Sequence, residues 1–224
     1  TIASGAVGFA QYANYLLPWL HGWQMKALAA LVCLFNTVLL YRDIKSINVL
    51  SIVMWIVVMG TGGWILLGGF THFNASLAFQ FPPNAFHLSS QFFLGLGAAT
   101  LIAMYDYSGY FNVCLIGAEV REPARNIPRA ILISIAVIAV LYLLMNFSII
   151  GVIPWQQAMQ SKAIVADFVE KIYGATGGKI VALLILWAAF GSVFAILLGY
   201  SRIPYAAAKD GRFFAAFARL HPTK

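Results

Sequence analysis

The chain has 224 residues, of which 62% are hydrophobic and only 9% are charged. Soluble proteins carry about 25% charged residues and about 45–50% apolar ones, so this composition excludes a chain whose whole surface faces water. Intrinsic disorder is excluded as well, because it requires low hydrophobicity and high charge. The net charge of +7 includes no basic run that could form a nucleic-acid interface. The composition predicts a protein that crosses the lipid bilayer several times.

Hydrophobic runs give the expected transmembrane helices. A helix that crosses the bilayer needs about 20 mostly apolar residues. The candidates are residues 1–19, 25–41, 47–69, 89–118, 130–153 and 178–202. Residues 154–177 are more polar and are expected to form a partly helical external loop. The predicted fold class is an all-α integral membrane protein with about six transmembrane helices.

The basic residues predict the orientation of these helices. Ten of the 14 Lys and Arg residues fall around 42–46, 119–129 and 202–224. Loops rich in Lys and Arg stay on the cytoplasmic side, so the first span is expected to run outward. The predicted location is the plasma (inner) membrane, as a multi-pass protein.

Metal, disulfide and enzyme chemistry are not expected from the side chains present. Cys33 and Cys114 lie in apolar stretches without CxxC spacing, and the four His residues are scattered through predicted loops. A membrane enzyme would need clustered nucleophiles, metal ligands or paired carboxylates. Asp106 is the only acidic residue well inside a predicted span. We therefore expect neither catalysis nor a metal or other cofactor.

The fourth hydrophobic segment, residues 89–118, is too long for one straight span. Thirty residues of α-helix rise about 45 Å, whereas the hydrocarbon core is about 30 Å thick. Polar residues and a glycine occupy its middle, at Tyr105, Asp106, Tyr107, Ser108 and Gly109. One interpretation is a long tilted helix whose polar residues face its neighbours. The other, which we favour, is a discontinuous helix of residues 89–104 and 110–118, because non-helical backbone at membrane depth must line a cavity or be buried in protein.

A broken helix of this kind has a specific binding chemistry. The carbonyl groups that end the first half carry negative partial charge and accept hydrogen bonds from an ammonium group or a cation. The N–H groups that begin the second half suit an anion. A small zwitterion can use both ends, and secondary transporters with interrupted helices bind substrates in this way.

Three stretches of sequence resemble those of the amino acid–polyamine–organocation (APC) superfamily, and specifically its bacterial-type amino acid permeases. Residues 4–12 (SGAVGFAQY) are similar to that family's third span. Residues 117–131 (GAEVREPARNIPRAI) are similar to the loop after its sixth span, and residues 199–211 (GYSRIPYAAAKDG) to the loop after its eighth. The resemblance covers the whole chain in order.

The resemblance implies a fragment of the leucine-transporter fold, with two inverted five-helix repeats. Residues 1–88 would then end the first repeat, and residues 89–224 would begin the second. The chain opens at Thr1 without a signal-peptide pattern and stops at Lys224 in a polar loop, so we expect a piece of a longer protein, about spans three to eight. The family's first span, which supplies amides for the substrate carboxylate, would lie outside it.

The resemblance also implies the site residues. The family's sixth-span aromatic gate and carbonyl ligands fall on Tyr105, Asp106 and Tyr107, and Ser108 and Gly109 complete the unwound turn. Many family members carry a small residue where this chain has Asp106, which could favour a cationic substrate, bind a coupling proton or cap the backbone. A Lys often found in the fifth span is replaced by Met54. Ser192 is either a further cation ligand or a packing hydroxyl.

Glu119 and Arg121 are candidates for a cytoplasmic gate, in which Glu119 pairs with a basic residue. The alternative is that they belong only to a solvated loop.

Together these observations predict a secondary active transporter that moves amino acids by alternating access, with proton coupling or exchange. Its expected partners are an amino acid, the bilayer and a coupling proton. A polyamine or cationic amino acid carrier is the first alternative. A non-transporting membrane receptor or channel of the same fold is the second.

Overall fold

A computed structural model of the chain describes residues 2–41, 44–82 and 85–218. Within these ranges the secondary structure is helical, with no strand. This agrees with the predicted all-α fold class.

The first three predicted spans are formed as continuous helices. Helix α1 spans Ile2–Leu16, α2 spans Trp23–Leu40 and α3 spans Ile44–Thr71. Helix α1 ends just before Pro18, which cannot donate a helical hydrogen bond. The turn into α2 contains Gly22 at φ 52°.

Three described helical segments lie between α3 and the fifth predicted span. Helix α4 (Ala75–Ala78) is capped by Asn74, whose side chain accepts from the N–H of Ser76. Helix α5 (Ser90–Asp106) is capped by Ser89 in the same manner, and the 3₁₀ helix η1 (Tyr110–Glu119) follows it. Side-chain oxygens at these positions satisfy N–H groups that the first helical turn leaves unpaired.

The remaining described helices are α6 (Pro123–Ile150), α7 (Trp155–Gln160), α8 (Ile164–Tyr200), α9 (Arg202–Lys209) and the 3₁₀ helix η2 (Ala215–Ala218). Of these, α6 and α8 begin earlier than the hydrophobic runs 130–153 and 178–202 indicated. Helix α6 starts at a proline, which is favoured at the first helical position. Helix α8 carries Asp167 in its first turn, where negative charge suits the helix dipole, and it is bent at Gly174. The predicted loop at 154–177 is therefore mostly helix.

Four of the described helical stretches are long and apolar enough to cross a membrane: Trp23–Leu40, Val49–Thr71, Pro123–Ile150 and Ile164–Lys209. The first and fourth predicted spans form shorter helices of 15 and 17 residues, α1 and α5. At 1.5 Å per residue these rise only about 23 Å and about 26 Å. All six predicted spans thus correspond to helices, and the fourth is divided between α5 and the 3₁₀ helix η1.

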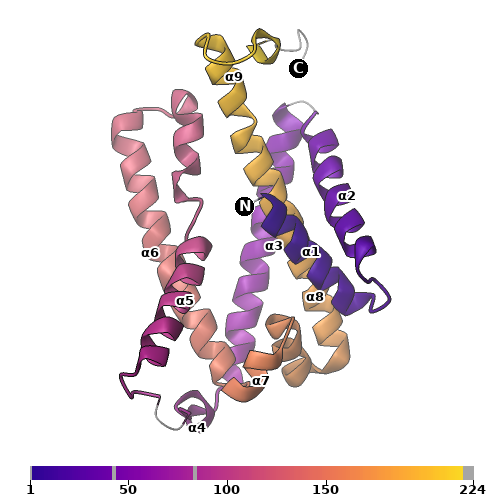
Figure 1. The fold of residues 1–224 in the computed structure, drawn as a ribbon, viewed down its shortest axis with the longest axis vertical. Helices are drawn as coiled ribbons and strands as arrows, with labels where there is room; N and C mark the ends of the chain where they lie inside the picture. The colour runs from indigo at the N-terminus through magenta and orange to yellow at the C-terminus, as the bar shows by residue number, and fades with distance from the viewer. Residues whose placement is uncertain (1, 42–43, 83–84, 219–224) are drawn as a thin grey trace.

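Helix α8 is the centre of the packing. It lies against α1, α2 and α3, and its residues Phe168, Val169, Val181 and Ala182 are among the most buried in the chain. Helices α5 and α6 run along the flank of this group, as Figure 1 shows.

Helix α6 is fixed to α3 at one point of close approach. A Cβ on Gly69 would collide with Ser148, which is fully buried. The absence of a side chain at Gly69 therefore lets the two helices approach closely, as small residues do in membrane bundles.

Candidate functional site

The fourth predicted span is broken between α5 and η1. The N–H of Tyr107 still donates to the carbonyl of Ala103 at 3.0 Å, as in an α-helix, but the N–H of Ser108 donates to Tyr105 at 3.0 Å in a tighter turn. Gly109 then adopts φ 123° and ψ −17°. Residues other than glycine rarely adopt such a φ, so Gly109 is the residue that permits the break.

The break is shorter than the sequence indicated. We expected residues 105–109 to be non-helical, whereas Tyr105 and Asp106 belong to α5. The reason is that helical hydrogen bonding continues up to Tyr107, and the change of direction is confined to Gly109. The segment after the break is a 3₁₀ helix over Tyr110–Glu119, close to the expected 110–118.

A side chain from α6 binds the broken end of α5. In a continuous α-helix the carbonyl of Asp106 would accept from the N–H of residue 110. Here it accepts from the hydroxyl of Tyr142, at 3.3 Å. The ring of Tyr142 also meets that of Tyr107 edge to face, with centroids 5.4 Å apart and planes at 87°. Tyr142 therefore contacts two successive residues at the break.

A pocket of about 420 Å³ opens beside this point, between α5 and α6. It is lined by Ala103, Asp106, Tyr107, Tyr142, Leu143, Met145, Asn146 and Ile149. We call it the break pocket. Its polar groups include the carboxylate of Asp106 and the amide of Asn146, whose Nδ2 donates to the carbonyl of Tyr142 at 2.8 Å. Among the described residues, no Lys or Arg forms an ion pair with Asp106.

The other residues expected at the site point elsewhere. The hydroxyl of Tyr105 is hydrogen bonded to Ser4, which links α5 to α1. The hydroxyl of Ser108 donates to the carbonyl of Met104 at 3.2 Å, within its own helix. The break pocket thus contains Asp106 and Tyr107 but not the side chains of all five predicted residues.

Ser192 lines a different pocket, of about 330 Å³, between α3 and α8. Met54 lies in the same pocket and is only 4% exposed. Its sulfur lies 3.3 Å from the point that a Cβ on Gly191 would occupy. The two candidate coupling residues, Ser192 and Asp106, are therefore in different pockets, and the thioether of Met54 lies beside Gly191, next to Ser192 in the chain.

The candidate cytoplasmic gate is described only in part. The side chain of Glu119 lies outside the described part of the chain, so its pairing with Arg121 stays a prediction. Arg121 is exposed, and its carbonyl accepts from Nδ2 of Asn126 at 2.6 Å. Glu122 has a left-handed backbone at φ 48°, and its carboxylate lies 3.9 Å from Arg125. Because both partners are exposed, that ion pair contributes at most about 1 kcal/mol.

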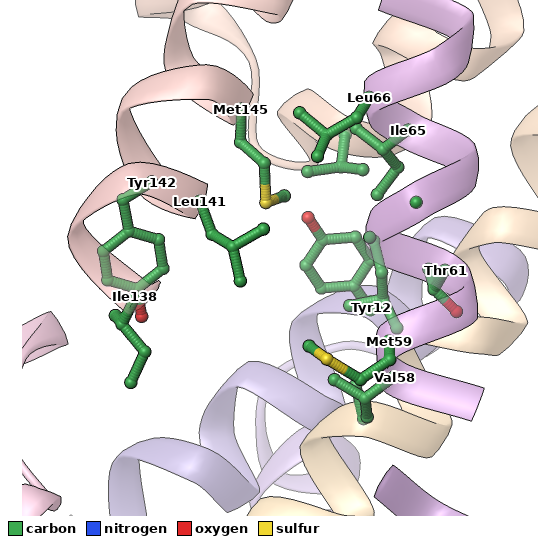
Figure 2. A pocket seen from close by; sticks show the side chains of 15 residues that line it. Tyr12, Val58, Met59, Thr61, Ile65, Leu66, Ile138, Leu141, Tyr142 and Met145 are labelled. Carbon is green, nitrogen blue, oxygen red and sulfur yellow. The ribbon is translucent and has the colours of Figure 1, made fainter. Parts of the chain in front are cut away.

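A third cavity, of about 510 Å³, lies between α1, α3, α6 and α8. Figure 2 shows Tyr12 pointing into it from α1, with Leu141, Tyr142 and Met145 on the α6 side. Its lining is almost entirely apolar, and it shares Tyr142 and Met145 with the break pocket. We call it the apolar cavity.

Sequence reasoning missed Tyr142 and Asn146. Both lie in the predicted span 130–153, four residues apart, on one face of α6. Two polar side chains at that spacing inside an apolar run were a usable signal, because polar groups in a membrane span usually face the protein interior. What they face depends on the tertiary structure.

Comparison with known proteins places these features in a family. A family model described as amino acid permease matches residues 1–224. Cationic amino acid transporter 4 of Homo sapiens is 32% identical over 58% of this chain and 20% of its own length. An uncharacterized amino acid permease of Bacillus subtilis, YvbW, is 30% identical over 98% of this chain and 50% of its own. Large neutral amino acids transporter small subunit 2 of Mus musculus is 30% identical over 62% and 26%. The matched region thus spans half or less of each relative.

Proposed function

The chain belongs to the amino acid permease family, and from this membership we propose that the protein moves amino acids across a membrane by alternating access. The family and the relatives above are transporters, not enzymes. The observation that carries the proposal is the helix break at Gly109 beside a pocket that contains Asp106. Transporters with discontinuous helices bind their substrates at such breaks, near the middle of the membrane.

The proposed substrate site comprises Tyr105, Asp106, Tyr107, Ser108 and Gly109. The C-terminal end of α5 carries a partial negative charge, to which the carboxylate of Asp106 adds a full one. Both attract the ammonium group of an amino acid. The pocket volume of about 420 Å³ lies within the range usual for small-molecule sites.

Asp106 is also the proposed coupling residue. A carboxylate at membrane depth costs at least a few kcal/mol unless it is neutralised, paired or hydrated. No Lys or Arg among the described residues pairs with it. A proton and the cationic group of a substrate are therefore the proposed partners of this carboxylate. Ser192, in its own pocket, is a second proposed coupling residue, and Glu119 with Arg121 remains the proposed cytoplasmic gate.

The same carboxylate supports the alternative of a cationic amino acid or polyamine carrier. One relative is named a cationic amino acid transporter and another a large neutral amino acids transporter, so the names of the relatives favour neither class. A receptor or channel of the same fold would share the break without transporting.

The proposed architecture has residues 1–88 at the end of one inverted repeat and residues 89–224 at the start of the next. Rocking of one repeat against the other would expose the break to each side in turn. The proposed location is the plasma (inner) membrane.

Competition between labelled substrates tests this function. Cells that express the protein at its full natural length receive labelled leucine, arginine or putrescine, each with the other two as competitors, and cells without the protein are the control. Saturable uptake of leucine or arginine supports the proposal. Uptake of putrescine alone supports the polyamine alternative, and no saturable uptake or exchange of any of the three refutes transport.

A further inference from the structure

We propose that Tyr142 is a positioning residue that holds the broken end of α5 and thereby sets the affinity of the break for its substrate. The inference rests on the proposed function, and it concerns a residue of α6 rather than of the broken segment itself.

Within the described part of the chain, helix α5 makes few contacts that fix its position. It has no buried residue along Ser90–Asp106. Its C-terminal end is held by side-chain bonds from two other helices, one from Ser4 to Tyr105 and one from Tyr142 to the carbonyl of Asp106. A helix without a buried face has little hydrophobic packing to fix its end, so individual side-chain bonds carry more of that task.

Tyr142 is well placed to act as the fixed partner. It lies on α6 six residues before Ser148, which is fully buried at the close approach to Gly69 of α3. The backbone of Tyr142 is itself tied down, because its carbonyl accepts from Asn146 at 2.8 Å. Helix α6, which is anchored to α3, thus provides a hydroxyl that binds the end of α5.

The two contacts of Tyr142 act on the groups that the substrate is proposed to use. The hydroxyl takes the place of the missing backbone donor at Asp106, at 3.3 Å. The ring packs on Tyr107 at 5.4 Å. Because the carboxylate of Asp106 extends from the same residue whose carbonyl is held, movement of that backbone would move the carboxylate as well.

Tyr142 also lies between two spaces. It lines both the break pocket and the apolar cavity, so its ring is part of the wall between them. Loss of the hydroxyl alone leaves this wall in place. A variant without the hydroxyl therefore tests whether Tyr142 positions the end of α5, without changing the separation of the two pockets.

Tyr142→Phe in the protein at its full natural length is the direct test. The ring contact with Tyr107 is kept and only the bond to the Asp106 carbonyl is lost. We expect KM for the transported amino acid to rise about two- to tenfold, the range that one hydrogen bond supports, with a smaller change in kcat. Tyr205→Phe in α9, away from both pockets, is the matched control and should leave both constants unchanged.

A labelling experiment provides a readout independent of transport. In the protein at its full natural length, with every native cysteine including Cys33 and Cys114 replaced by serine, Ser108→Cys places one thiol in the break. Tyr142→Phe should raise the rate at which a water-soluble maleimide labels this thiol, because the turn opens more often.

An unchanged KM or an unchanged labelling rate overturns the proposal. If the wild-type protein takes up no amino acid, the proposed function fails, and the labelling rate still decides whether Tyr142 positions the break.

Discussion

Replacing Gly109 by alanine isolates the backbone contribution to the helix break. Gly109 has φ 123° and ψ −17°, a conformation that an L-residue adopts only under strain. The space around it is open enough for a methyl group, since the nearest atom to an added Cβ would be Nδ2 of Asn112, at 3.7 Å. Steric collision with neighbours therefore does not contribute, and the cost arises from the backbone alone.

The size of this cost follows from the backbone conformation. Residues held in sparsely populated φ/ψ regions cost about 1–3 kcal/mol each. Because 1.4 kcal/mol corresponds to a factor of ten, the native geometry of the break should become about 5- to 150-fold less populated relative to alternatives. Substrate affinity should fall by a similar factor, because the competent state is populated less often.

The assay compares Gly109→Ala with Gly97→Ala in the protein at its full natural length. Gly97 lies inside α5, and an added Cβ there also meets open space, so the chemical change is the same. Alanine inside a helix is favourable by about 0.5–1 kcal/mol, so the control should be neutral or slightly stabilising. We expect Gly109→Ala to raise KM at least fivefold. Equal KM values for the two variants would show that the break does not depend on the conformation of Gly109.

Two further substitutions test the charge and the packing of the site. Asp106→Asn keeps the shape of the side chain and removes its charge, so we expect uptake to lose its pH dependence or its preference for cationic substrates. If this variant keeps the wild-type uptake rate, pH dependence and substrate preference, the role of Asp106 is purely structural. Gly69→Ala should lower the free energy of unfolding by about 1–3 kcal/mol, because its Cβ collides with Ser148. Gly62→Ala in the same helix meets open space, and thermal unfolding in detergent that is equal for both variants would contradict the close approach of α3 and α6.

The helix break could be predicted because it follows from length and chemistry within one segment. Residues 89–118 are too long for one straight span and have a polar centre with a glycine, and both facts can be obtained from the sequence. The residue at which the break begins could not be predicted in this way. Tyr105 and Asp106 are as polar as their neighbours, but the helical hydrogen bonds continue to Tyr107.

The starts of α6 and α8 were misplaced for a related reason. Charges in 119–129 indicated a loop and those in 154–177 a partly helical loop, whereas Pro123 begins α6 and Asp167 lies in the first turn of α8. Charged residues are compatible with a helix that extends beyond the hydrocarbon core, and proline is favoured at its first position. Helix-start signals therefore locate these ends better than hydropathy does.

The partner of the break could not be predicted, because it comes from a residue 36 positions away. The local sequence pattern shows that Tyr142 and Asn146 share a face of α6, but it does not show that α5 ends beside them. The phenol hydroxyl replaces a backbone donor at the carbonyl of Asp106, and this replacement depends on how α5 and α6 pack together.

The hydrogen bonds at the break also bear on which end of a zwitterion the pocket suits. The single hydroxyl hydrogen of Tyr142 is engaged by the carbonyl of Asp106, and an amide hydrogen of Asn146 is engaged by the carbonyl of Tyr142. Two of the pocket's donors are therefore turned toward the backbone, while the carboxylate of Asp106 offers only acceptors when ionised. A lining of this kind favours a group rich in donors, such as an ammonium, and disfavours a carboxylate. The carboxylate of an amino acid would then need N–H groups on the other side of the break, where η1 begins after Gly109.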